Sequence, residues 1–130
     1  MDIKTHNKIS QNLCGTPIKL ENEYCLVELK TSECMVADEA GLVHGGFIFG
    51  AADYAAMLAV NHQNVVLGSA NVKFCSPVKM GNVIKFEATV KEKEAIKRIV
   101  EVIGYDGDSK VFSGEFICYI LEKHVLEAKK

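Results

Sequence analysis

Hydrophobic residues form one long run in the middle of the chain and mostly alternate with polar residues after it. The run from Phe47 to Val60 is rich in Ala, Met and Leu, and its length favours a helix over a strand. A helix that is apolar on nearly all sides has to be buried on nearly all sides. The pattern therefore predicts one central helix in the interior of the protein.

Strand-like segments make up most of the remaining chain. Residues 99–103 and 112–116 alternate between apolar and polar positions, as half-buried strands do. Turn signals at 79–82 and 106–108 separate consecutive segments. We expect a hairpin over residues 17–30 with its turn at 21–23, followed after the helix by four strands at 65–75, 82–93, 97–106 and 110–122.

The two ends and the segment before the helix carry weaker signals. Residues 1–16 are polar and have the spacing of a weak helical stripe, which Gly15 is suited to end. Residues 31–42 mix polar and acidic positions and are expected to form a loop. The charged segment 123–130 is expected to be a solvated tail.

One buried helix and a run of antiparallel strands is an α+β plan, in which a curved sheet wraps the helix. We expect residues 1–130 to form a single domain of this kind. Such a sheet leaves one stripe of the helix open, and the same stripe of a second copy would cover it. We therefore expect a homodimer, and the sequence leaves open whether two dimers form a tetramer.

Charge excludes several classes of function. The chain has 130 residues and a formal net charge of -2, and Arg98 is its only arginine. Nucleic acids and anionic membrane surfaces attract proteins through a basic field, which this composition lacks. The longest nearly apolar run is too short to span a bilayer. We expect neither a nucleic acid nor a membrane as a partner.

Cysteine and histidine positions give no sign of disulfides or metals. The five cysteines are scattered, form no Cys-x-x-Cys pair and follow no apolar leader, which is typical of reduced thiols in a cytoplasm. The four histidines lack the paired spacing of metal ligands. We expect a cytoplasmic protein without a metal or a cofactor.

Asp53 is the unusual residue of the apolar run. An unpaired carboxylate in an apolar helix costs several kcal/mol unless it is neutralised, paired or hydrogen-bonded, and no Lys or Arg lies within one helical turn of it. Two interpretations remain open on the residue alone. Asp53 either bonds an amide or hydroxyl of the sheet, or acts as a general base or nucleophile whose pKa burial adjusts.

The glycine pair Gly45-Gly46 stands at the start of the expected helix. It either permits a tight turn or leaves free N–H groups that could polarise a carbonyl, assisted by the helix dipole. Asp53 follows Gly46 by seven residues, which is about 10 Å along a helix axis. One substrate carbonyl cannot contact both within a chain. Antiparallel helices of a dimer would bring Asp53 of one copy to the Gly46 amide of the other.

The stretch 41–53 resembles the signature of hotdog-fold acyl-CoA thioesterases of the phenylacetate-pathway type. In both, a His-Gly-Gly sequence (here His44-Gly45-Gly46) is followed by six residues and then an aspartate, here Asp53. The later succession of four strands also fits the hotdog order. The resemblance implies a hotdog fold and hydrolysis of an acyl-CoA, although the same superfamily contains dehydratases and binding proteins.

The resemblance also implies roles for single residues. Gly46 would donate its N–H to the thioester carbonyl, with Gly45 beside it, and Asp53 of the partner chain would activate water or attack the carbonyl directly. His44 would shape the loop or bond near the carbonyl. Ser69 would position water or is simply exposed. Phe47, with other apolar residues of the helix, would line the acyl tunnel or belongs to the core.

A second resemblance concerns residues 69–74 and 111–116, which are similar to the effector domain of the malonyl-CoA-responsive repressor of fatty-acid synthesis. That domain has the same fold and binds acyl-CoA without hydrolysing it. By this resemblance Lys73 would contact an anionic acyl or phosphate group, and otherwise it is an ordinary exposed lysine. The repressor lacks an acid at the position of Asp53, which this chain has.

Two hypotheses follow from these observations. The first is an acyl-CoA thioesterase with its site shared between two subunits, acting in fatty-acid metabolism. The second is a non-catalytic acyl-CoA sensor of the same fold. They differ in whether an ionised Asp53 faces room for water beside a bound thioester. The length and chemistry of the acyl group cannot be derived from the sequence.

Overall fold

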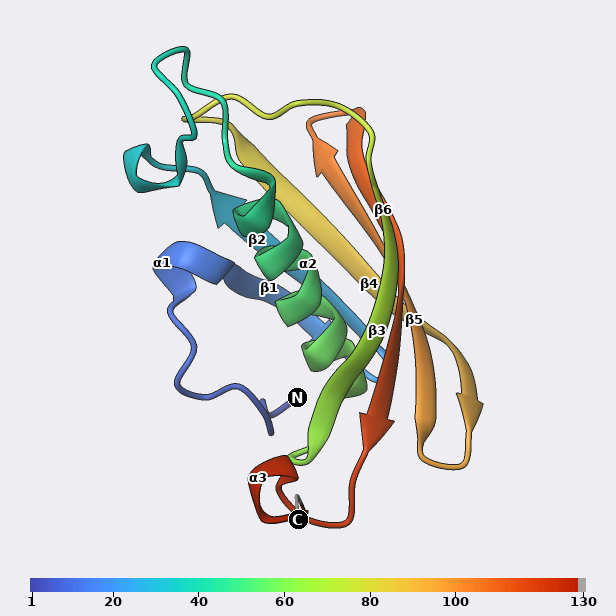
Figure 1. Cartoon of the computed structure of the whole chain (residues 1–130). Helices are drawn as coiled ribbons and strands as arrows, with labels where there is room; N and C mark the ends of the chain where they lie inside the picture. Colours follow the sequence, from blue (N-terminus) through green and yellow to red (C-terminus); the bar gives the residue numbers. More distant parts are fainter. Residues whose placement is uncertain (129–130) are drawn as a thin grey trace.

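A six-stranded antiparallel sheet curves around one long helix in the computed structural model, which describes residues 1–128 (Figure 1). The strand order is β1-β2-β4-β5-β6-β3, so β1 and β3 form the two edges. The chain thus has the expected α+β hotdog architecture. The strands are β1 (Thr16–Glu21), β2 (Tyr24–Lys30), β3 (Val65–Phe74), β4 (Val83–Glu94), β5 (Lys97–Asp106) and β6 (Ser109–Ile120).

The central helix α2 (Gly45–Val60) crosses the concave face of the sheet and packs mainly on β2, β4 and β5 (Figure 1). Nine of its sixteen residues are buried, which agrees with its apolar composition. It begins at the glycine pair, two residues before the apolar run. It ends at Asn61, which adopts a left-handed backbone conformation (φ 52°) and bonds back to the carbonyl of Met57.

The core lies between α2 and the sheet. Side chains from alternate positions of β2, β4, β5 and β6 point inward, as the alternation along these strands predicts. The largest fully buried side chains include three aromatic rings: Phe86, Phe112 and Phe116. Phe112 contacts the other two, at ring distances of 6.1 and 6.3 Å.

Most of the expected elements are confirmed within one or two residues. The hairpin turns at Asn22-Glu23, and each of the four later strands begins or ends near its expected bound. In the N-terminal segment 1–16, the short helix is α1 (Gln11–Cys14), and it ends at Gly15 (φ 96°) as expected. Residues 1–10 form no helix, because they contain too few apolar side chains to hold one against the core.

The loop and the tail contain structure that the sequence did not indicate. A short 3-10 helix (Glu33–Met35) lies within the expected loop and buries Met35 completely. The short helix α3 (Val125–Ala128) lies in the expected solvated tail, near the N-terminal segment (Figure 1). The last two residues of that tail lie outside the described part of the chain.

Candidate active site

An open stripe runs along α2, as the sequence predicts. The less buried positions Gly46, Phe49, Gly50 and Asp53 recur with helical spacing, while the other faces of the helix meet the sheet and core. A Cβ added at Gly50 would meet nothing within 4 Å, so the stripe is hollow between its two ends. Gly46 and Asp53 therefore lie on the same side of the helix, with open space at Gly50 between them.

Asp53 is the only charged residue of α2, and its carboxylate is poorly compensated. Its Oδ1 atom is buried and has no hydrogen-bond partner within residues 1–128. Burial removes water from the carboxylate and raises the pKa of Asp53 from 3.8 to about 6. Within residues 1–128, Oδ1 therefore lacks the amide or hydroxyl partner that a structural aspartate would use.

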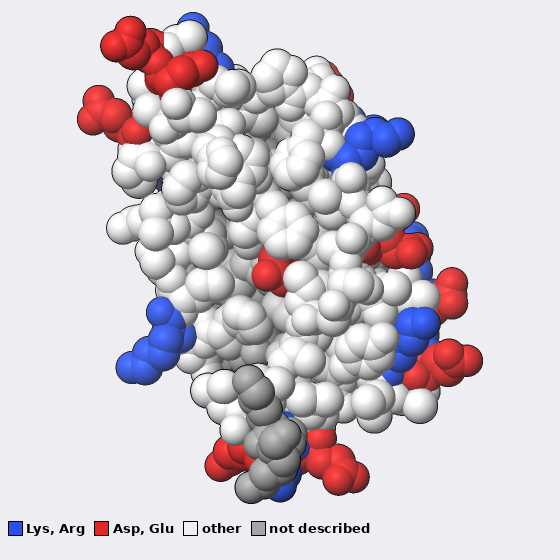
Figure 2. All heavy atoms as spheres, viewed as in Figure 1, with Lys and Arg blue, Asp and Glu red and all other residues white. Residues whose placement is uncertain are grey.

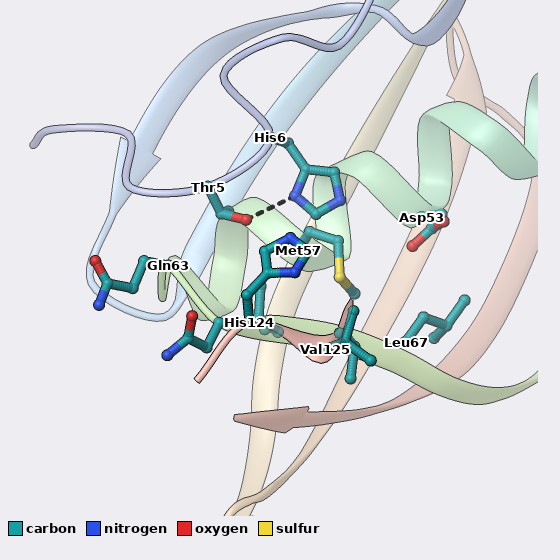
Figure 3. Close-up of a pocket in the computed structure, with 11 residues that line it drawn as sticks. Thr5, His6, Asp53, Met57, Gln63, Leu67, His124 and Val125 are labelled. Atoms are coloured by element: carbon teal, nitrogen blue, oxygen red, sulfur yellow. Dashed lines mark hydrogen bonds between the residues drawn. The ribbon is translucent and has the colours of Figure 1, made fainter. Parts of the chain in front are cut away.

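A cavity of about 360 Å³ opens beside Asp53, between the C-terminal half of α2 and the start of β3 (Figure 3). Met57, one turn after Asp53, and Leu67 on β3 form apolar walls. The N-terminal segment contributes Thr5 and His6, and the segment before α3 contributes His124. Asp53 thus lies at the wall of a space that could hold a substrate group.

His6 and His124 are cavity residues that the sequence analysis did not select. His6 precedes the first helix by several residues, and His124 lies in the segment expected to be a solvated tail. Neither lies in a motif with Asp53, because the fold alone brings the two chain ends to α2. A left-handed His6 (φ 57°) is the one unusual backbone feature here, and it is not visible in the sequence.

The other end of the stripe is the start of α2. His44 is the residue before the helix, and its side chain makes no capping bond to the helix. A Cβ at Gly46 would come within 3.0 Å of the His44 ring, and a Cβ at Gly45 within 3.3 Å of the Phe74 ring. Side chains larger than hydrogen would crowd both rings. The first N–H groups of a helix have no partner inside it, so this end can bind a carbonyl oxygen or an anion.

The remaining predicted site residues are Ser69, Lys73 and Phe47. Ser69 is exposed on β3, and Lys73 lines a second groove of about 400 Å³ on the strands, with Lys91 and Lys110. Phe47 is half-buried, and its ring lies 6.2 Å from that of His44. None of these three predicted residues lines the cavity beside Asp53.

The molecule has a face that is nearly free of charge (Figure 2). Lys, Arg, Asp and Glu side chains lie at its margins, and one acidic group lies near its middle. In the same view α2 and β3 lie in front (Figure 1). β3 pairs only with β6 among the described strands, and its residues Gly68–Asn71 are exposed.

The described residues show neither a metal cluster nor a membrane-spanning helix. Across residues 1–128, no three His, Cys, Asp or Glu side chains are grouped as a metal ion would require. Within the same part of the chain, no helix has both the length and the apolar character needed to cross a bilayer.

Residues 40–113, more than half of the chain, match the family model described as the thioesterase superfamily. The chain therefore belongs to the thioesterase superfamily. A solved structure of an uncharacterized protein from Pyrococcus horikoshii is 51% identical, covers 97% of both chains and superposes with a TM-score of 0.96. The E. coli PaaI protein of the phenylacetic acid degradation operon is 18% identical, covers 86% of this chain and 83% of its own, and with a TM-score of 0.79 shares the fold.

Curated relatives carry other names. A protein from Aquifex aeolicus named methylthioribose-1-phosphate isomerase is 56% identical over 93% of this chain, but the match covers only 26% of that protein. The transcription factor FapR of Bacillus velezensis is 35% identical over 60% of this chain and 43% of its own length. The chain thus spans about a quarter to a half of these relatives, and their names describe the longer proteins.

Proposed function

We propose that the protein is an acyl-CoA thioesterase whose site is completed by a second subunit. The single observation that carries this proposal is the buried, unpartnered Oδ1 of Asp53 beside an open cavity. Membership of the thioesterase superfamily supports the same reaction class. A cytoplasmic location and a place in fatty-acid metabolism are part of the proposal.

In the proposed reaction Asp53 takes a proton from a water molecule, and the oxygen of that water attacks the thioester carbonyl. Negative charge then develops on the carbonyl oxygen, where the Gly46 N–H and the positive end of the helix dipole stabilise it. The C–S bond breaks, the CoA thiolate takes up the proton that Asp53 removed from the water, and the acid product leaves. A pKa of about 6 leaves Asp53 mostly ionised at neutral pH and therefore able to act as the base. Direct attack by the carboxylate on the carbonyl remains the alternative to this role.

Two subunits are needed because Gly46 and Asp53 lie two helical turns apart in one chain, about 10 Å along the axis. We propose that two copies associate through the nearly uncharged face, with their α2 helices antiparallel. Each dimer then has two sites, each combining Gly46 of one chain with Asp53 of the other. The exposed edge of β3 and the hollow at Gly50 support this arrangement.

The proposal also assigns roles to the other predicted residues. The His44 ring lies against the Gly46 backbone and fixes the shape of the oxyanion-binding loop. Gly45 has no side chain and therefore allows the Phe74 ring to approach. Phe47 borders the acyl group, Ser69 of exposed β3 positions the water, and Lys73 contacts a CoA phosphate from its groove.

The test is release of free CoA from short, long and aromatic acyl-CoAs, detected by chromatography because the chain's five cysteines would react with a thiol dye. The wild type should release CoA, and Asp53→Asn should lower kcat by about 10² or more. Hydrolysis that is equal in both proteins would overturn the role of Asp53.

A second candidate function is a non-catalytic acyl-CoA sensor, which the similarity to the transcription factor FapR favours. A sensor would bind an acyl-CoA saturably in calorimetry without releasing CoA. Asp53→Asn would then leave the affinity roughly unchanged. The same panel of acyl-CoAs therefore separates the two candidates.

A further inference from the structure

The residues that line the cavity beside Asp53 differ from one side to the other. Asp53 lies on one side and Gln63 on the other, with His6, Met57 and His124 between them (Figure 3). Its volume of about 360 Å³ compares with about 30 Å³ for one water molecule in the liquid, which leaves room for an acyl group of roughly ten non-hydrogen atoms. A thioester carbonyl next to Asp53 would direct its acyl chain into this space.

The His6 ring is fixed in this cavity by a hydrogen bond. Thr5 is buried, and its Oγ1 lies 2.7 Å from Nδ1 of His6. The Tyr54 ring of α2 lies 6.3 Å from the imidazole. With Nδ1 engaged by Thr5, the second ring nitrogen, Nε2, lies on the side of the ring away from Thr5 (Figure 3). An oriented imidazole therefore offers one free polar atom to the cavity.

The end of α2 holds the segment that carries His6. Asn61 accepts a bond at Oδ1 from the N–H of Lys4 and donates from Nδ2 to the carbonyl of Asp2, both at 2.8 Å. His6 itself has a left-handed backbone (φ 57°), a conformation that few non-glycine residues adopt. The N-terminal segment is thus tied to the helix whose Asp53 faces the same cavity.

The charges of the lining exclude one class of acyl group. Among residues 1–128, no Lys or Arg lines the cavity, and Asp53 contributes a carboxylate. Burial lowers the pKa of His6, so its imidazole is mostly neutral at neutral pH. His124 is the other imidazole of the lining, and Gln63 and Thr5 are uncharged. An acyl group that ends in a carboxylate would find no Lys or Arg of the described residues in this lining and would meet the Asp53 carboxylate.

A simple alkyl chain would also fit poorly, because it would bury Nε2 of His6 without a partner. Buried polar groups left unpaired cost more than the bond itself contributes, so a site with a fixed polar group discriminates against ligands that lack the complement. From these observations we infer that the cavity selects short acyl groups carrying an uncharged hydroxyl or oxo group, which bonds to His6. This inference rests on the proposed thioesterase function.

The test compares acyl-CoAs that differ only by a hydroxyl and a methyl group. The pairs are 3-hydroxybutyryl-CoA with 3-methylbutyryl-CoA, and 4-hydroxybutyryl-CoA with pentanoyl-CoA. For at least one pair the wild type should show a kcat/KM at least about tenfold higher for the hydroxylated member. Succinyl-CoA, which ends in a carboxylate, should be hydrolysed more slowly than that member.

Variants then assign the preference to His6. His6→Leu should bring the hydroxyl-to-methyl ratio to about one, and His6→Gln, which keeps a polar group, should retain part of it. Thr5→Val removes the bond that orients the His6 ring and should therefore reduce the ratio. His62→Gln is the matched control, since His62 is not among the residues that line the cavity and its ring accepts a local bond from the Asn64 N–H, and its ratio should equal that of the wild type.

The outcomes separate this inference from the proposed function. Equal or faster turnover of the methylated substrates by the wild type, faster turnover of succinyl-CoA, or a ratio unchanged in His6→Leu would overturn the inference and leave the thioesterase standing. If no acyl-CoA is hydrolysed, the proposed function fails. Calorimetric affinities for the same pairs would then decide the inference: a hydroxyl preference lost in His6→Leu supports it, and equal affinities overturn it.

Discussion

Gly46 and Asp53 occupy the same open stripe of α2, separated by two helical turns and by the hollow at Gly50. One end of this stripe carries unpaired helix N–H groups, and the other carries a buried carboxylate without a hydrogen-bond partner within residues 1–128. Two such stripes placed antiparallel bring each amide to a carboxylate. The proposed chemistry depends on this pairing.

The hollow at Gly50 should be sensitive to a large side chain. Gly50→Leu should lower acyl-CoA hydrolysis at least about tenfold, because the new side chain fills the space between the two ends of the stripe. Within one chain it should not destabilise the fold, since a Cβ there meets nothing within 4 Å and leucine favours the helix by roughly 0.8 kcal/mol over glycine. Thermal unfolding and CoA release measure the two effects, and wild-type turnover in Gly50→Leu would contradict the account.

The N–H of Gly46 can be removed by proline, which the first turn of a helix tolerates. Gly46→Pro should lower kcat by about 10²–10³, the usual loss when one oxyanion donor is deleted. Gly46→Ala keeps the N–H and is the matched control, although its Cβ comes within 3.0 Å of the His44 ring. Equal losses in the two variants would show that crowding by His44, and not the N–H, determines the effect.

The ionisation of Asp53 should appear in the pH profile. Because the base must be deprotonated, kcat/KM should rise with pH through a pKa near 6 and level off above it. Below that pKa the rate should fall about tenfold per pH unit. A profile that remains flat from pH 5 to 8 would exclude Asp53 as the general base.

Asp53 should also reduce the stability of the folded state at neutral pH. Its folded pKa is raised, so the native state binds more protons than the unfolded one and loses stability as pH rises from about 3.8 to about 6. The loss is at most about 3 kcal/mol. Asp53→Asn should therefore unfold at a higher temperature than the wild type at pH 7.5 and lose this advantage near pH 4. A wild type that is the more stable protein at pH 7.5 would show that an unrecognised partner compensates the carboxylate.

The fold was largely predictable from the sequence because its signals are local. The apolar run gives α2, and the alternation and turn residues give the strands. The open stripe also follows, and Asp53 can be selected as a candidate because one carboxylate in an apolar helix is visible in the sequence itself. Oδ1 of Asp53 has no hydrogen-bond partner within residues 1–128, an observation that supports the proposed role as a base.

The cavity could not be predicted, because residues from both chain ends form it. His6 and His124 are far apart in sequence, and neither lies in a regular element. The bonds from Asn61 that hold the N-terminal segment involve polar atoms without any periodic pattern. By contrast, Lys73 was selected because residues 69–74 resemble another acyl-CoA-binding domain, but it lies in a groove on the sheet that is separate from the cavity beside Asp53.

A mixture of two inactive variants tests the shared site most directly. Asp53→Asn and Gly46→Pro chains are unfolded together, refolded in equal amounts and assayed for CoA release. Random pairing makes half of the dimers mixed, and each mixed dimer has one intact site of two, so the account predicts about a quarter of the wild-type activity. Activity no greater than the sum of the separate variants would contradict a site built from Gly46 of one chain and Asp53 of the other.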